Sequence, residues 1–188
     1  MKQRMISSPR AVARFLSALL LLAAAGNFFT EPAWAQTNAA KLAARDTVVV
    51  KDLEAAIVNA EGLIRKYPDS DFSPSVMFQL VELYVKRATY DFQQRMSSYE
   101  LDLKRFDSGE LKAEPMMPRV GYGKAIEMGY RILQQYPTAP FNDKVIYRIA
   151  LCQMEEGNRD LSRDYFQRLL EEYPKSEYTV ESNFRLGE

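Results

Sequence analysis

Very few side chains in this chain of 188 residues could perform bond chemistry. There is no histidine, which removes the commonest general base and metal ligand, and no glycine-rich phosphate loop or serine-nucleophile motif. The single cysteine, Cys152, cannot build a zinc site of the usual Cys/His type. The pairs Glu155-Glu156 and Glu171-Glu172 could act as acids and bases, but on amphipathic helices such pairs are usually solvated. We therefore expect a non-catalytic protein with no metal and no cofactor.

Cys152 lies in a helical pattern directly after Ile149, Ala150 and Leu151. This setting favours a small buried side chain, and a reactive or intermolecular thiol is the alternative. One thiol cannot form an internal disulfide, so no such bond is expected in an exported chain.

The first 35 residues are laid out like a secretory signal peptide. Basic residues precede an apolar run, Phe15 to Ala25, and Ala33 and Ala35 are the small residues that a signal peptidase reads. We predict cleavage after Ala35 and a periplasmic location. An uncleaved membrane anchor is the alternative, although the run is shorter than the ~20 apolar residues that a span needs. Gln36 stands where a lipid anchor would require cysteine, so we expect no lipidation at this site.

Removal of this segment changes the charge of the chain. It takes away four basic residues and one acidic residue, which leaves 21 Lys and Arg against 24 Asp and Glu. A mildly acidic surface offers no electrostatic footprint for nucleic acid and no polybasic stretch for an anionic membrane. We expect a short linker over 36–51 and one domain over 52–188, with no transmembrane span after cleavage.

Three Tyr-Pro pairs organise the domain: Tyr67-Pro68, Tyr136-Pro137 and Tyr173-Pro174. Each pair closes a short amphipathic segment, and the pairs are 69 and 37 residues apart. Self-similarity at such a period is the signature of stacked helical repeats. The sequence therefore predicts an all-α solenoid of helical hairpins.

The best-preserved unit covers 144–174. Apolar residues at helical spacing define its first helix, Gly157 suits a left-handed turn, Asn158 could cap a second helix, and Pro174 ends that helix. The unit resembles the tetratricopeptide repeat at six positions: Ala150, Gly157, Ser162, Phe166, Leu169 and Pro174.

The links also resemble those of one group of bacterial envelope repeats. Tyr67 to Phe72 and Tyr173 to Tyr178 share the pattern Tyr-Pro-x-Ser-x-aromatic, and Tyr136 to Phe141 follows it loosely. Outer-membrane assembly lipoproteins and TolA-binding cell-division coordinators carry repeats of this type. The resemblance implies a helical scaffold that binds a protein or peptide partner in envelope assembly or maintenance.

The interval of 69 residues exceeds one period by 32, which predicts an insert between Ala88 and about Arg119. An apolar stripe continues through the first part of this insert, so we expect one helix from Pro74 to Phe106, about 50 Å long at 1.5 Å per residue. Four large residues on its far half would form an arm: Phe92, Met96, Tyr99 and Phe106. The arm either packs on the returning chain, 110–120, and the next repeat, or binds a partner or a second copy.

The first helices of stacked hairpins line a concave face. Phe78, Tyr147 and Phe184 occupy one register there, with Glu82 and Arg148 beside them. This set could form a peptide-binding groove, and it could equally be ordinary packing for such repeats. The segment 179–188 opens a further repeat that stays incomplete, which favours either a short capping helix or a longer natural chain.

These observations predict a non-catalytic periplasmic protein-binding scaffold. One alternative is the non-catalytic leading domain of a larger envelope enzyme, and another is a homo-oligomeric structural protein assembled through the arm.

Overall fold

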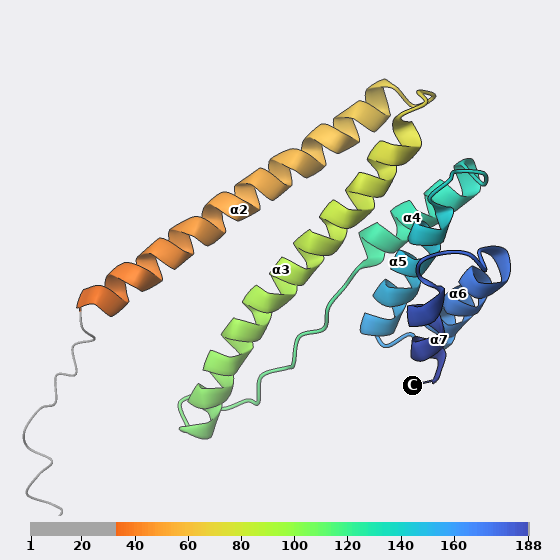
Figure 1. The fold of residues 1–188 in the computed structure, drawn as a ribbon. Coiled ribbons are helices and arrows are strands. Elements are labelled where there is room, and N and C mark those ends of the chain that lie inside the picture. The colour runs from red at the N-terminus through yellow and green to blue at the C-terminus, as the bar shows by residue number, and fades with distance from the viewer. Residues whose placement is uncertain (1–32, 188) are drawn as a thin grey trace, which may run out of the picture. The chain divides into compact units, whose positions relative to one another are not determined.

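The computed structural model describes residues 33–187, and side chains from Val48 onward (Figure 1). The chain divides into two compact units, one up to Arg45 and one from Asp46. The second unit contains all three Tyr-Pro links. The expected signal peptide, 1–35, lies outside the described residues except for its last three. Those three residues begin the first described helix.

Every element in the described residues is an α-helix, as predicted. The helices are α2 (Ala33–Lys66), α3 (Ser73–Asp107), α4 (Gly123–Gln135), α5 (Asn142–Glu155), α6 (Arg159–Glu172) and α7 (Thr179–Gly187). The elongated helix expected from Pro74 to Phe106 is α3, at 35 residues. The segment 36–51, expected as a linker, instead lies inside α2. Its alanines and its run of valines continue the helix without a breaker.

The three Tyr-Pro links repeat one backbone hydrogen-bond pattern. The tyrosine carbonyl accepts the N–H three residues later, from Ser70, Ala139 and Ser176, at 3.3, 3.1 and 2.9 Å. The next N–H groups in the pattern belong to Ser73, Asn142 and Thr179, which donate to those same three residues at 2.8, 3.1 and 3.3 Å. These positions keep the 69 and 37 offsets read from the sequence, so the links are structurally equivalent.

Side chains reinforce the first two links in the same way. Ser73 Oγ donates to the carbonyl of Tyr67 at 2.6 Å, and Asn142 Nδ2 donates to the carbonyl of Tyr136 at 2.8 Å. Both residues begin a helix and are almost fully buried. Because proline cannot continue the preceding helix, these bonds satisfy the carbonyl exposed at the turn.

The buried core runs from the end of α2 through α3, α4 and α5, and α6 adds further buried side chains. Its largest fully buried side chains include Ile132, Ile149, Phe166 and Leu169, each at most 1% exposed. Gly129 lets α4 approach α5, because a Cβ at this position would lie 2.8 Å from Cγ1 of Ile149. The close approach explains why glycine stands in the middle of a helix.

Gly157 joins α5 to α6 with φ of 86°, as the sequence predicts for a left-handed turn. The N–H of Asn158 donates to the carbonyl of Gln153 at 2.8 Å, which closes the turn. The prediction that Asn158 caps α6 with its side chain is wrong. Its Nδ2 instead donates to Oε1 of Gln153 at 2.8 Å.

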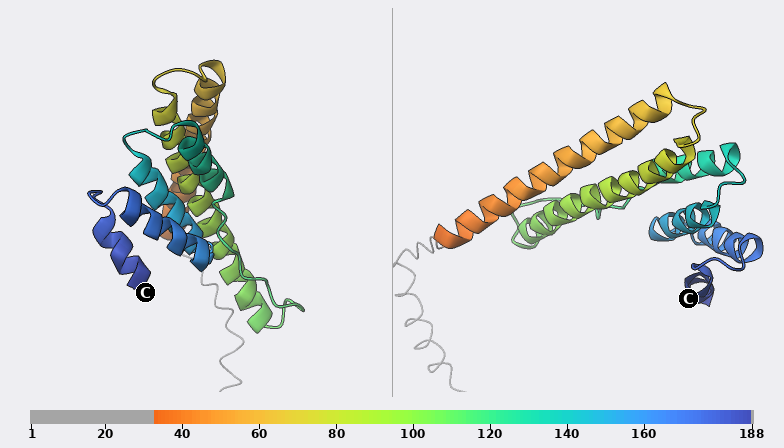
Figure 2. Two further views of the ribbon diagram at one scale, coloured as in Figure 1. Left: turned by 90° about the vertical axis from the view of Figure 1, so that its right-hand side faces the viewer. Right: turned by 45° about the horizontal axis from the view of Figure 1, so that its top comes forward.

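The chain returns along the far half of α3 as an extended segment, 110–122 (Figures 1 and 2). Arg95 Nη2 donates to the carbonyl of Arg119 at 3.0 Å, and the hydroxyls of Thr89 and Tyr122 lie 3.2 Å apart. The two ends of the expected insert therefore lie next to each other at the base of the arm.

Candidate protein-binding surfaces

The aromatic residues expected to share one groove are covered to different degrees. Phe78 packs on Phe141 with ring centroids 5.6 Å apart, and Tyr147 stacks on Tyr178 at 4.4 Å. Phe184 is 60% exposed. Two of the three rings are therefore packed against the next link along the chain. Phe78 and Tyr147 are half-buried, and Phe184 is the most exposed ring of the three.

Glu82 and Arg148 meet in a paired hydrogen bond between α3 and α5. Nε of Arg148 lies 2.7 Å from Oε1 of Glu82, and its Nη2 lies 2.8 Å from Oε2. Both side chains are about one third exposed. This geometry fixes the guanidinium and carboxylate on each other, so the pair braces two neighbouring helices.

The four expected arm residues, Phe92, Met96, Tyr99 and Phe106, are all half-buried. The returning segment lies along this part of α3 (Figure 2). Leu101 on the arm is 61% exposed, and Met116 on the returning segment is 92% exposed. The returning chain thus shields the predicted stripe partially, while Leu101 of α3 and Met116 of the returning segment face solvent.

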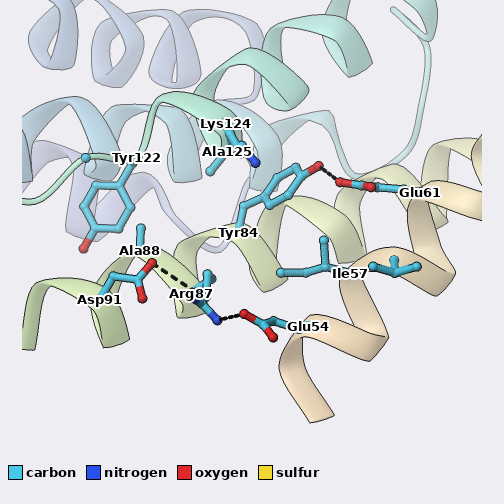
Figure 3. A pocket seen from close by; sticks show the side chains of 12 residues that line it. Glu54, Ile57, Glu61, Tyr84, Arg87, Ala88, Asp91, Tyr122, Lys124 and Ala125 are labelled. Atoms are coloured by element: carbon cyan, nitrogen blue, oxygen red, sulfur yellow. Dashed lines mark hydrogen bonds and ion pairs between the residues drawn. The ribbon is translucent and has the colours of Figure 1, made fainter. Parts of the chain in front are cut away.

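A cleft opens between α2, α3 and the start of α4 (Figure 3). Its volume is about 640 Å³. Apolar walls come from Ile57, Val58, Ala88 and Ala125, and Tyr84 and Tyr122 add aromatic surface. This volume lies within the range of about 300–1,000 Å³ that is usual for ligand-binding pockets.

The charged groups of the cleft are held by one another. Tyr84 donates its hydroxyl to Glu61 at 2.6 Å, and Arg87 joins Glu54 of α2 at 2.5 Å to Asp91 of α3 at 3.0 Å (Figure 3). The hydrogen bond to Asp91 is the main cause of the raised pKa of Arg87, and the bond to Glu54 adds to it, whereas burial opposes it. Burial, assisted by the Glu61 bond, raises the pKa of the Tyr84 hydroxyl. Tyr84 therefore stays neutral and Arg87 stays charged at any physiological pH.

Lys124 adds a second cation, with Nζ 5.7 Å from the centre of the Tyr84 ring. Three carboxylates and two cations then line the cleft, from Glu54, Glu61, Asp91, Arg87 and Lys124. This set can recognise polar and charged groups by hydrogen bonding.

Tyr122 connects the cleft to α5. Its hydroxyl donates to Glu155, and its backbone N–H donates to Glu156. Burial and the bond to Glu155 raise the pKa of Tyr122 to about 12. The sequence suggested that these two glutamates are merely solvated. Glu155 is exposed, as expected, and Glu156 is half-buried; both in addition hold Tyr122, the residue that precedes α4.

Sequence reasoning did not find the cleft. Its signal was present in the spacing: Glu54 and Glu61 are seven residues apart on one helix, as are Tyr84 and Asp91 on the next. Such spacing places each pair on one helix face. The sequence did not show that these faces of α2 and α3 lie opposite each other, because the pairing of helices across a link depends on packing.

The segment with the best-preserved repeat also matches a known family. Residues 144–176 match the tetratricopeptide repeat family. No curated protein matches the chain. Among residues 33–187, no helix combines the length and apolar character that crossing a membrane would require. The matched segment contains α5, α6 and the third Tyr-Pro turn, and the first two links share its hydrogen-bond pattern. The chain thus carries a tetratricopeptide repeat within an all-helical solenoid of hairpins.

Proposed function

We propose that this protein is a non-catalytic scaffold that binds a protein or peptide partner in the bacterial periplasm and serves assembly or maintenance of the cell envelope. Tetratricopeptide repeats generally mediate protein–protein interactions, which supports the binding role. The observation that carries the proposal is the cleft between α2, α3 and α4, with its apolar walls and fixed charged groups.

The cleft suits a peptide segment for a physical reason. Ile57, Val58 and Ala88 offer apolar contact, while Arg87 and Glu61 offer oriented hydrogen bonds at the edge. A peptide presents both kinds of group along one strand or helix face. The fixed side chains also lower the conformational entropy lost on binding.

The binding role can be tested by capture from a periplasmic extract with two matched variants of the full chain. Val58 and Val48 are both exposed valines of α2, and of the two it is Val58 that lines the cleft. We expect Val58→Glu to reduce capture of a specific protein at least about fivefold, as one buried apolar contact would. Val48→Glu should capture as the wild type does. If no captured protein distinguishes the two variants, the cleft is not the binding site.

The location is supported by the layout of the first 35 residues. Cell fractionation followed by N-terminal sequencing tests it. We expect the chain in the periplasmic fraction, beginning at Gln36. A cytoplasmic chain that retains Met1 would contradict the proposed location and leave the binding role to be judged by the capture experiment.

A further inference from the structure

Inside this solenoid, the second and third links each cover an aromatic ring on the first helix of the hairpin that precedes the link. Phe141, in the second link, packs on Phe78 of α3 at 5.6 Å. Tyr178, in the third link, stacks on Tyr147 of α5 at 4.4 Å. Phe141 and Tyr178 are 37 residues apart, which is one repeat period. Phe78 and Tyr147 are 69 residues apart, because the 32-residue insert lies between them. One packing rule therefore repeats along the chain.

The same rule leaves two complementary rings unmatched in the described residues. Phe72 is the aromatic residue of the first link, and it is 46% exposed. Phe184 lies on α7 in the register of Phe78 and Tyr147, and it is 60% exposed. Phe72 makes an edge contact with Tyr67 at 6.0 Å, and the Arg185 guanidinium lies 5.8 Å from the Phe184 ring. Within the described residues, Phe72 therefore lies in a link that follows α2 alone and not a complete hairpin, and Phe184 lies on the first helix of a hairpin whose second helix and link are not among these residues.

The surface around Phe72 is also less covered than the equivalent surfaces of the later hairpins. Helix α2 stands in the place of α4 and α6, since each precedes an equivalent link. Leu63 of α2 is 43% exposed, whereas its counterparts Ile132 and Leu169 are 0% exposed. Leu63 lines an apolar groove of about 520 Å³ between α2 and α3, together with Ala56, Ala60, Val76 and Leu83. In the later hairpins, α3 packs on α4 and α5 packs on α6, and α7 occupies the same place in the repeat as α3 and α5.

We propose that copies of this chain associate head to tail, with α7 of one copy in the α2–α3 groove of the next and Phe184 against Phe72 of that second copy. The occupant is a second copy because this chain carries both halves of the interface. Their pairing repeats the contact already made by Phe78 with Phe141 and by Tyr147 with Tyr178. The contact is heterologous, so each dimer keeps one free end of each kind and can add further copies.

Complementation between two variants of the full chain tests this arrangement by sedimentation velocity. Phe72→Asp and Phe184→Glu each remove one half of the interface, and neither residue belongs to the buried core, so we expect the fold to be retained. We expect the wild type to form concentration-dependent oligomers and each variant alone to remain at the mass of one chain. An equimolar mixture should give a species of twice that mass and nothing larger, because one intact interface remains per pair.

Other outcomes overturn the proposal. A monomeric wild type, a single variant that still associates, or a mixture that stays monomeric would each do so. Met116→Asp, at a 92% exposed position of the returning segment, serves as the control and should associate like the wild type. Circular dichroism of each variant verifies that its helices are intact.

A gain-of-affinity variant tests the register. Inside the chain, Lys144 and Glu177 form an ion pair at 3.5 Å. The corresponding positions at the proposed junction are Glu181, which pairs with Arg185 at 2.8 Å, and Asp71 of the second copy, so the junction places two carboxylates opposite each other. We expect Asp71→Lys to tighten association about two- to fivefold, as an exposed ion pair would. Unchanged or weaker association would contradict this register.

Discussion

At the scale of single residues, Cys152 shows how burial decides chemistry. It lies on α5 within the core, is 3% exposed, and burial raises its pKa to about 12. A thiolate is the reactive form of cysteine, so this thiol is inert in the folded protein. The sequence predicted the buried role from Ile149 and Ala150 beside it. The alternative of a reactive thiol is not supported by this environment.

The raised pKa predicts a pH dependence of stability. The unfolded chain releases the Cys152 proton near pH 9, whereas the folded chain retains it to about pH 12. The contribution is therefore fully present below pH 9 and is lost as the pH rises toward 12. In urea unfolding between pH 9 and 11, the wild type should lose up to about 1.4 kcal/mol per pH unit more than Cys152→Ala. Equal pH slopes for the two proteins would show that the thiol is not protected.

At the scale of elements, α3 has two halves with different support. Met77, Leu80 and Val81 in its first half are at most 1% exposed. Beyond Thr89 the helix has no fully buried residue, and its cover is the returning segment with few hydrogen bonds. The far half thus depends on its own backbone bonds and on partial burial of its apolar stripe.

This difference predicts graded hydrogen exchange along one helix. Amides of residues 93–105 should exchange at least about tenfold faster than those of residues 78–86, because the arm can open without disturbing the core. Exchange mass spectrometry of the full chain measures both segments in one experiment. Uniform protection along α3 would mean that the arm is held more firmly than its exposed surface indicates.

At the scale of the whole molecule, the sequence predicted the repeat period and the helix lengths, but it did not predict which helix faces contact each other. The Tyr-Pro pairs predicted the repeat ends because proline acts locally on the chain. The apolar stripe from Leu80 to Phe106 predicted the length of α3, because helical spacing of apolar residues is also a local property of the chain. The covering of Phe78 by Phe141, the bridge from Glu82 to Arg148 and the cleft around Tyr84 required knowledge of which helix faces meet. Such contacts are set by packing between distant segments.

The proposed head-to-tail association concerns the whole chain. It extends a packing rule seen twice inside the chain to the contact between chains, so the interface variants test the rule and the assembly together. Because the cleft and the proposed junction use different residues, Val58→Glu should leave association unchanged. Partner binding and self-association can then be measured separately.

The contact between Thr89 and Tyr122 has a consequence for how this architecture can vary. Since the arm leaves and rejoins the hairpin at neighbouring points, the 32 extra residues form a side branch that carries none of the stacking geometry. A branch of this kind can lengthen, shorten or disappear while the neighbouring helices keep their register, because closing a longer loop between fixed points adds little entropic cost. The length and sequence of the arm can thus change without altering the packing of the neighbouring helices.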